Sequence, residues 1–154
     1  SMPRPAPDWA GPLSDPRMPL GRDGYGYRFV LPDEVSWQST IFIGIVEDPG
    51  FTSTAITTRT MSQCILTSGF YLTVDVTMDA YTEQPITIDG VSGTEADFLQ
   101  LCASPDRHTK GSALRVIVLD SSPERTWFFS AVPMERADHI AAVDAATAGL
   151  QVTG

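Results

Sequence analysis

The sequence predicts an α+β fold, in which an antiparallel sheet of about six strands carries a C-terminal helix. Residues 70–81 alternate apolar and polar side chains without a break, which is typical of a strand with one buried face. Residues 112–133 contain two arms rich in β-branched and aromatic residues around a loop at residues 120–125, which indicates a hairpin. Residues 134–150 repeat apolar side chains at helical spacing and reach a plausible helix stop at Gly149.

The remaining elements follow from shorter patterns. Residues 25–32 indicate a first strand that ends at a proline, and residues 39–48 are apolar on both faces, which predicts a strand covered on both sides. Residues 52–66 mix β-branched residues with apolar residues at helical spacing, so we expect an extended start and a helical or irregular end. Residues 85–103 predict a strand, a turn at Asp89-Gly90 and a further strand.

Length and composition indicate one folded unit. The chain has 154 residues, of which 42% are hydrophobic and 19% charged, as in an ordinary globular domain. Prolines concentrate in residues 1–23, which lack apolar periodicity and favour an extended linker. We therefore expect a poorly ordered proline-rich linker over residues 1–23 and a single α+β domain over residues 24–154.

Three stretches resemble one protein family in chain order. They are YGYRFVLPDEVSW at residues 25–37, PITIDGVSG at residues 85–93 and TWFFSAVPMERADHIAAVDAATAGLQV at residues 126–152. These stretches resemble PsbP-like domains, whose aromatic-rich first strand runs into a proline and then a tryptophan, here Pro32 and Trp37. The resemblance implies an α/β/α sandwich. It also implies a binding role, since the family includes an extrinsic photosystem subunit, a small Ran-binding protein and many exported bacterial lipoproteins.

The charge of the chain limits its partners. The chain has a formal net charge of −9 and a pI near 4.4. A negatively charged protein repels phosphate backbones, so we expect no nucleic-acid partner. No apolar run approaches the roughly 20 residues that cross a bilayer, so we expect no transmembrane segment. A protein partner or a small ligand remains.

Metal and cofactor chemistry have no clear signal in the sequence. Cys64 and Cys102 lack the spacing of a metal site, and no glycine-rich phosphate loop leads into a helix, so we expect neither a metal nor a cofactor. The two cysteines are either a disulfide of an exported protein or two buried free thiols.

Two histidines could act as a general base near neutral pH. We expect His139 to be a partly exposed residue of the C-terminal helix. His108 lies in a polar loop with Ser104, Asp106 and Ser112, which suggests a small hydrolase as an alternative function. A catalytic triad depends on geometry that this spacing does not provide, so we expect no catalytic residue.

The polar side of residues 70–81 is the candidate binding surface, with Tyr71, Asp75, Asp79 and Tyr81 in one row. It is either a ligand or partner surface or, as such alternation favours, the solvated or helix-covered side of a sheet. Trp127 joins the candidates because adjacent rings in the run Trp127 to Phe129 face opposite ways, so at least one leaves the main core.

The sequence therefore predicts a non-catalytic binding or accessory domain of an exported or membrane-anchored bacterial protein, with a cytoplasmic location as the alternative. A second alternative is the extracellular sensor domain of a transmembrane regulator, in which residues 1–23 form the juxtamembrane linker.

Overall fold

The computed structural model describes residues 1–15, 17–32, 37–47, 50, 53–71, 74–103 and 108–152. Within these residues it contains seven strands and two helices: β1 (Ala10–Ser14), β2 (Gly21–Val30), β3 (Gln38–Val46), α1 (Thr54–Ile65), β4 (Val76–Ile88), β5 (Val91–Cys102), β6 (Gly111–Leu119), β7 (Thr126–Pro133) and α2 (Ala137–Ala148). The predicted α+β class is confirmed, and the sheet has one strand more than expected.

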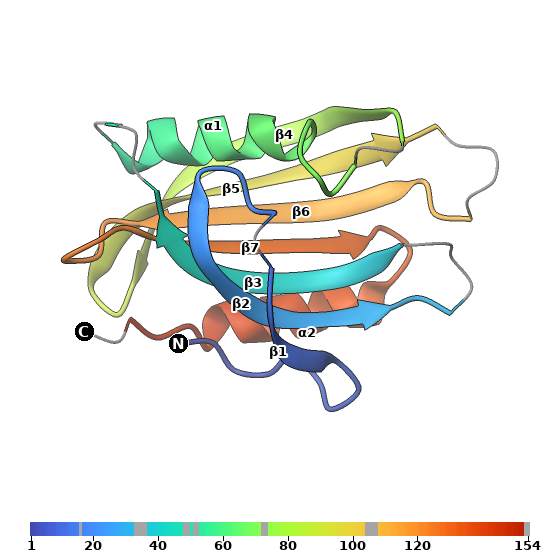
Figure 1. Ribbon diagram of the computed structural model, residues 1–154, viewed down its shortest axis with the longest axis horizontal. Helices are drawn as coiled ribbons and strands as arrows, with labels where there is room; N and C mark the ends of the chain where they lie inside the picture. The colour runs from blue at the N-terminus through green and yellow to red at the C-terminus, as the bar shows by residue number, and fades with distance from the viewer. Residues whose placement is uncertain are drawn as a thin grey trace.

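All seven strands belong to one antiparallel sheet with the order β1-β2-β3-β7-β6-β5-β4. The chain builds β1 to β3 first and crosses through α1 to the far edge. It then returns strand by strand from β4 to β7 (Figure 1). The last strand, β7, closes the sheet by pairing with β3. The predicted hairpin is confirmed, because β6 ends at Leu119 and β7 begins at Thr126.

The two helices cover opposite faces of the sheet (Figure 1). Side chains alternate along β3 and β7, so Phe42 and Phe129 point toward α1 while Ile41 and Phe128 point toward α2. Each face therefore has its own core. The α1-side core includes Phe42, Met61, Ile65, Val116, Trp127 and Phe129. The α2-side core includes Trp9, Ile41, Ile117, Phe128, Val143 and Ala146.

The first residues of the chain differ from the predicted linker. Strand β1 pairs with β2, and Trp9 is fully buried in the α2-side core. Arg4 donates a hydrogen bond from Nε to the carbonyl of Trp9 at 3.1 Å. A strand at the edge of a sheet tolerates Pro12, because one side of it forms no ladder hydrogen bonds. A single buried tryptophan produces no periodic pattern, which is why composition pointed to a linker.

Helix α1 replaces the extended start that was expected within residues 52–66, and that expectation was wrong for the described part. Ser53 caps the helix by accepting a hydrogen bond from the Ile56 amide at 3.3 Å. Thr58 and Ser62 are buried, and their hydroxyls donate to carbonyls, Thr58 to Thr94 of β5 at 3.3 Å. The bond from Thr58 to β5 is a tertiary contact, and such contacts override the weak helix propensity of the β-branched residues.

Strand β4 spans parts of two segments that the sequence predicts as separate strands, residues 70–81 and the strand that starts at residue 85. It begins at Val76 and continues to Ile88, and the pairing register shifts between Asp79 and Thr82. Ala80 has a φ of 51° at this bulge. The extra residue changes which side chains face α1, so the uninterrupted row predicted along residues 70–81 does not form.

Gln100 of β5 is an unusual core residue. It is fully buried on the α1 side, and among the residues that the structure describes neither its amide nitrogen nor its amide oxygen has a hydrogen-bond partner. Burial of an unpaired amide costs free energy, because water would satisfy both atoms in the unfolded chain.

We expect Gln100→Met to unfold at the same or a higher urea concentration than the wild type, with a gain of up to about 1 kcal/mol, because methionine has a similar volume and no unpaired amide. Tryptophan fluorescence during urea unfolding measures the change. Gln63→Met on the exposed side of α1 is the matched control. A clear loss of stability in Gln100→Met alone would contradict this interpretation.

Candidate functional site

Tyr71, the first residue of the predicted polar row, lies in the core. Its side chain is only 9% exposed, and its ring packs against Trp37 with centroids 6.1 Å apart. Burial raises the pKa of its hydroxyl above the usual value. Tyr71 follows α1 in a turn rather than in a strand, and little of its side chain is open to a ligand.

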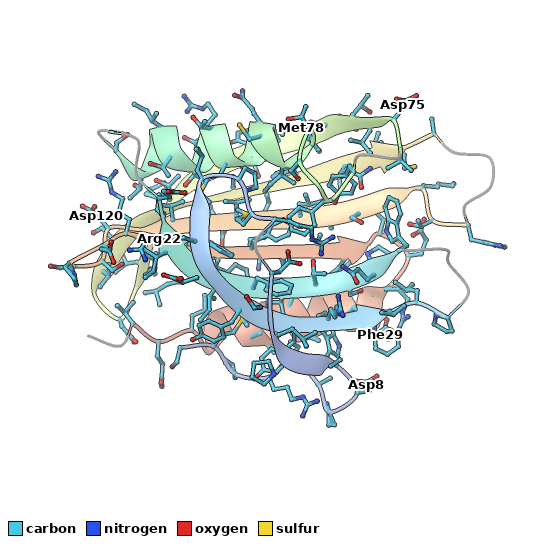
Figure 2. The ribbon with its side chains drawn as sticks, viewed as in Figure 1. Asp8, Arg22, Phe29, Asp75, Met78 and Asp120 are labelled. Carbon is cyan, nitrogen blue, oxygen red and sulfur yellow. The ribbon has the colours of Figure 1, made fainter. Side chains whose placement is uncertain are left out.

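The other three residues of that row are separated by the bulge in β4. Asp75 and Asp79 are exposed, with Asp75 at the outer edge of the molecule (Figure 2). Tyr81 packs against the α1-side core instead, and its hydroxyl donates to Glu83 at 2.8 Å. Burial and this carboxylate raise the pKa of Tyr81 to about 12. The structure therefore does not bring Tyr71, Asp75, Asp79 and Tyr81 together as one binding surface.

The predicted hydrolase residues also do not assemble within the described part of the chain. His108 is exposed, and Ser104 and Asp106 lie outside the described residues. Ser112 is buried, where its hydroxyl accepts a hydrogen bond from Trp37 Nε1 at 3.2 Å. Ser112 therefore has a structural role in the α1-side core.

Cys64 and Cys102 are both free thiols, the second buried in the α1-side core. In the ranges that the structure describes, no three His, Cys, Asp or Glu side chains are grouped to hold a metal ion. Neither α1 nor α2 has the length and apolar character of a membrane-crossing helix.

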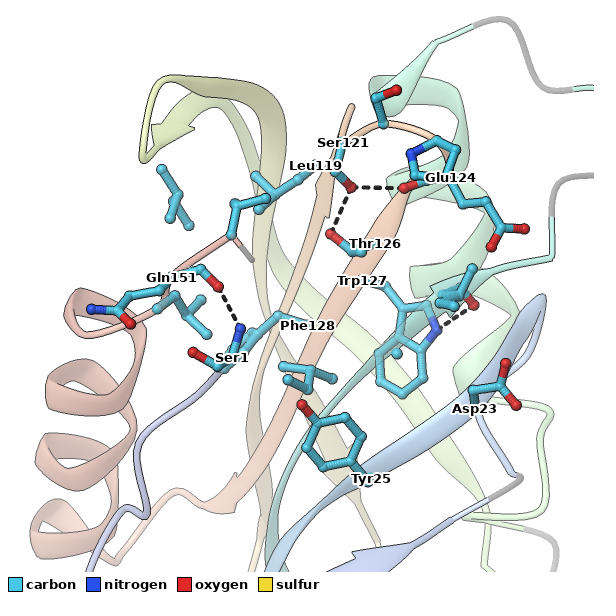
Figure 3. Close-up of a pocket in the computed structure, with 18 residues that line it drawn as sticks. Ser1, Asp23, Tyr25, Leu119, Ser121, Glu124, Thr126, Trp127, Phe128 and Gln151 are labelled. Atoms are coloured by element: carbon cyan, nitrogen blue, oxygen red, sulfur yellow. Dashed lines mark hydrogen bonds between the residues drawn. The ribbon is translucent and has the colours of Figure 1, made fainter. Parts of the chain in front are cut away.

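A pocket of about 460 Å³ opens at one end of the sheet, next to the end of α2 (Figure 3). This volume is within the range of small-molecule sites. Strands β2, β3 and β7, the loop between β6 and β7, the end of β4 and the chain after α2 contribute to it. Its described lining comprises Ser1, Asp23, Tyr25, Ile43, Gly44, Ile45, Ile88, Leu119, Ser121, Ser122, Pro123, Glu124, Thr126, Trp127, Phe128, Leu150, Gln151 and Val152.

Strand alternation makes much of the lining apolar. Ile43, Leu119 and Phe128 point to the α2 side, where they continue the α2-side core beyond the helix. The chain after α2 forms another wall. Hydrogen bonds fix it in place, from the Gln151 amide to the Ser1 carbonyl at 3.0 Å and from the Val152 amide to Asp89 Oδ2 at 3.0 Å.

Trp127 is the one predicted binding residue that lines this pocket. Its side chain is 2% exposed, and its indole Nε1 donates to the Ile45 carbonyl at 2.9 Å. The ring packs against Gly44, where a Cβ atom would come within 2.5 Å of Cζ2. Trp127 therefore packs against the strands that form the pocket.

Polar groups collect at the rim formed by β2 and the β6–β7 loop (Figure 3). Asp23 and Glu124 both pair with Arg22. The Ser121 hydroxyl bonds to the carbonyl of Glu124 at 2.8 Å and to the Thr126 hydroxyl at 3.0 Å. Sequence reasoning missed this rim, because its residues come from segments far apart in the chain and form no motif.

His139 is buried at 4% exposure, which corrects the expected partly exposed position. Its ring contacts Trp9 and Phe29, and Ser39 Oγ lies 2.7 Å from Nδ1. Arg136 Nη2 lies 2.5 Å from Nε2. Because a guanidinium only donates, Nε2 must accept, and Nδ1 carries the proton that it donates to Ser39. His139 therefore does not take a proton from Ser39, and this pair is structural.

The fold and the pocket together define an α+β protein with one helix on each face of an antiparallel sheet. No protein-family model and no curated protein matches the sequence. Among solved structures, the chain is similar to PA94, a protein of unknown function and candidate regulator from Pseudomonas aeruginosa. The TM-score is 0.52 and the identity 15%, over 82% of each chain, so the likeness concerns the fold alone.

The burial of His139 predicts a pH dependence of stability. Desolvation and the neighbouring Arg136 lower the pKa of His139 below its ordinary value of 6.5. Below pH 6.5 the unfolded chain therefore binds a proton more readily than the folded chain, so the free energy of unfolding falls as the pH decreases toward the folded pKa. Above pH 6.5 this contribution is fully present.

Urea unfolding between pH 8 and pH 5 tests this in wild type and His139→Gln. The variant should lose the part of the pH dependence that lies below 6.5, and His108→Gln, which removes an exposed histidine, is the matched control. Parallel curves for wild type and His139→Gln would show that His139 does not contribute.

Close packing predicts that Gly44→Ala destabilises the protein by about 1–3 kcal/mol, because its Cβ would overlap the Trp127 ring and the Arg22 carbonyl. Thermal or urea unfolding measures this. Gly69→Ala is the control, since its Cβ would meet Arg17 only at an ordinary contact distance of 3.5 Å. Equal stability of the two variants would mean that the ring moves aside without cost.

Proposed function

We propose that this protein is a non-catalytic binding domain that holds a small molecule with an apolar body in the pocket at the end of the sheet. The pocket itself is the observation that supports this proposal. It is formed in the folded chain, with Ile43, Ile88, Leu119 and Phe128 on its inner surface and hydroxyl and carboxylate groups on its rim. Such a lining separates an apolar interior from a few polar contacts, as small-molecule sites do.

The lining favours binding over catalysis. Of its eighteen described residues, none is His, Cys or Lys, and Thr126 and Ser121 bond to each other rather than to a base. A serine or threonine nucleophile needs an adjacent general base. The hydroxyl groups are therefore best suited to hydrogen bonds with the polar end of a ligand.

The apolar interior supplies the affinity. Each methylene group of a ligand that leaves water is worth about 0.8 kcal/mol, so affinity should rise about fourfold per methylene until the pocket is filled. The polar rim would then orient the ligand, with its polar end at Ser121 and Thr126.

We also propose the family and the cellular location that the sequence implies. An antiparallel sheet with a helix on each face agrees with the arrangement expected of a PsbP-like domain. We propose with it that the protein acts in an exported or envelope-bound setting, where such domains serve as binding partners.

Titration with octyl glucoside below its micelle concentration, followed by amide NMR shifts, tests the pocket. We expect shifts to concentrate at Ile43, Leu119 and Phe128. Tyr25→Ala, which removes a 46% exposed ring from the pocket wall, should weaken binding about threefold or more.

Val30→Ala is the matched control, because Val30 is a 59% exposed apolar residue of the same strand that lies outside the pocket. Shifts scattered over the surface, or equal effects of the two variants, would contradict the proposed site.

A further inference from the structure

We propose that the pocket selects amphiphiles whose polar end is cationic, an amine or a quaternary ammonium group. This inference rests on the proposed binding function and adds the chemical class of the ligand. It follows from the charges on the rim, the exposed aromatic ring in the same lining and the positions of the nearby cations.

The charged side chains that line the pocket are both carboxylates, Asp23 and Glu124. Arg22 pairs with both, through Nη1 to Asp23 at 2.5 Å and through Nη2 to Glu124. One guanidinium against two carboxylates leaves a net negative charge at this rim. The two carboxylates are 65% and 49% exposed in their side chains, so a ligand can reach them from the pocket.

An exposed aromatic ring also belongs to the lining that holds these carboxylates. Tyr25 follows Asp23 by two positions in β2 and is 46% exposed. Figure 3 shows Tyr25 and Asp23 among the side chains that line the pocket. The face of an aromatic ring attracts a cation, and quaternary ammonium ligands are recognised in this way. A pocket lined by both carboxylates and an accessible ring is therefore matched to a cationic head.

The other charges nearby do not oppose this selection. Arg125 is paired with Asp120 at 2.9 Å. The amino group of Ser1 lies on the opposite wall, where it donates to the Gln151 carbonyl (Figure 3). The net charge of −9 also raises the local concentration of cations over that of anions. An anionic head placed at Asp23 and Glu124 would meet like charges.

Three ligands with the same chain test the proposal: octyltrimethylammonium, octyl glucoside and octyl sulfate, each below its micelle concentration. We expect the dissociation constants from amide NMR shifts at the pocket to rise in this order, with the cation bound about threefold to tenfold more tightly than the anion. The difference should shrink in 0.5 M salt.

The double variant Asp23→Asn/Glu124→Gln leaves Arg22 without its carboxylates, so its preference should reverse toward octyl sulfate while octyl glucoside binds as before. Asparagine suits position 23, where φ is 54°. Asp75→Asn/Asp79→Asn is the matched control, because it removes two exposed carboxylates away from the pocket.

The outcomes separate the two proposals. Equal binding of all three ligands at the pocket, or an equal change in both double variants, would overturn the cationic selectivity and leave the binding site in place. The absence of pocket shifts with every ligand would overturn the binding site as well. Reversal in the first double variant alone would establish the rim as the selective element.

Discussion

The pairing of β3 with β7 is the constraint on which the rest of the structure depends. This pairing places Gly44 opposite Trp127 and Ile43 opposite Phe128, so one face receives an indole ring over a glycine and the other an apolar surface. A slip by one residue would exchange the two faces and drive a side chain into the space of the ring. The register therefore fixes both cores, and with them the lining of the pocket.

The pocket arises because α2 is shorter than the strands that it covers. A helix of 12 residues spans about 18 Å, whereas the 8 residues of β7 and the 9 of β6 extend over about 26–30 Å. The apolar face of the sheet thus continues past Ala148, where the residues after α2, joined by Ser1, cover part of it. These residues form a wall rather than a lid, which leaves the pocket between them and Phe128.

The sequence predicts elements whose signals are local. The hairpin loop at residues 120–125 and the helix end at Gly149 were predicted correctly, because turn residues and helical periodicity act over a few positions. Strand β1 and the bulge at Ala80 were missed, since one is held by pairing at a sheet edge and the other by register with β5. Of the site only Trp127 was anticipated, because the other walls come from distant segments. Family and location stay predictions.

The N-terminal segment links the buried histidine to the pocket wall. The Trp9 ring contacts the His139 ring on the α2 side. Pro3 packs closely on Gly149, since a Cβ atom added to Gly149 would lie 2.9 Å from Cγ of Pro3. Ser1 belongs to the same segment, and its carbonyl accepts a hydrogen bond from the Gln151 amide beside the pocket. The N-terminal segment therefore helps to hold the wall in place, together with the bond from Val152 to Asp89. The free energy needed to detach the N-terminal segment can be lower than the free energy of global unfolding. It therefore influences how rigid the pocket wall is.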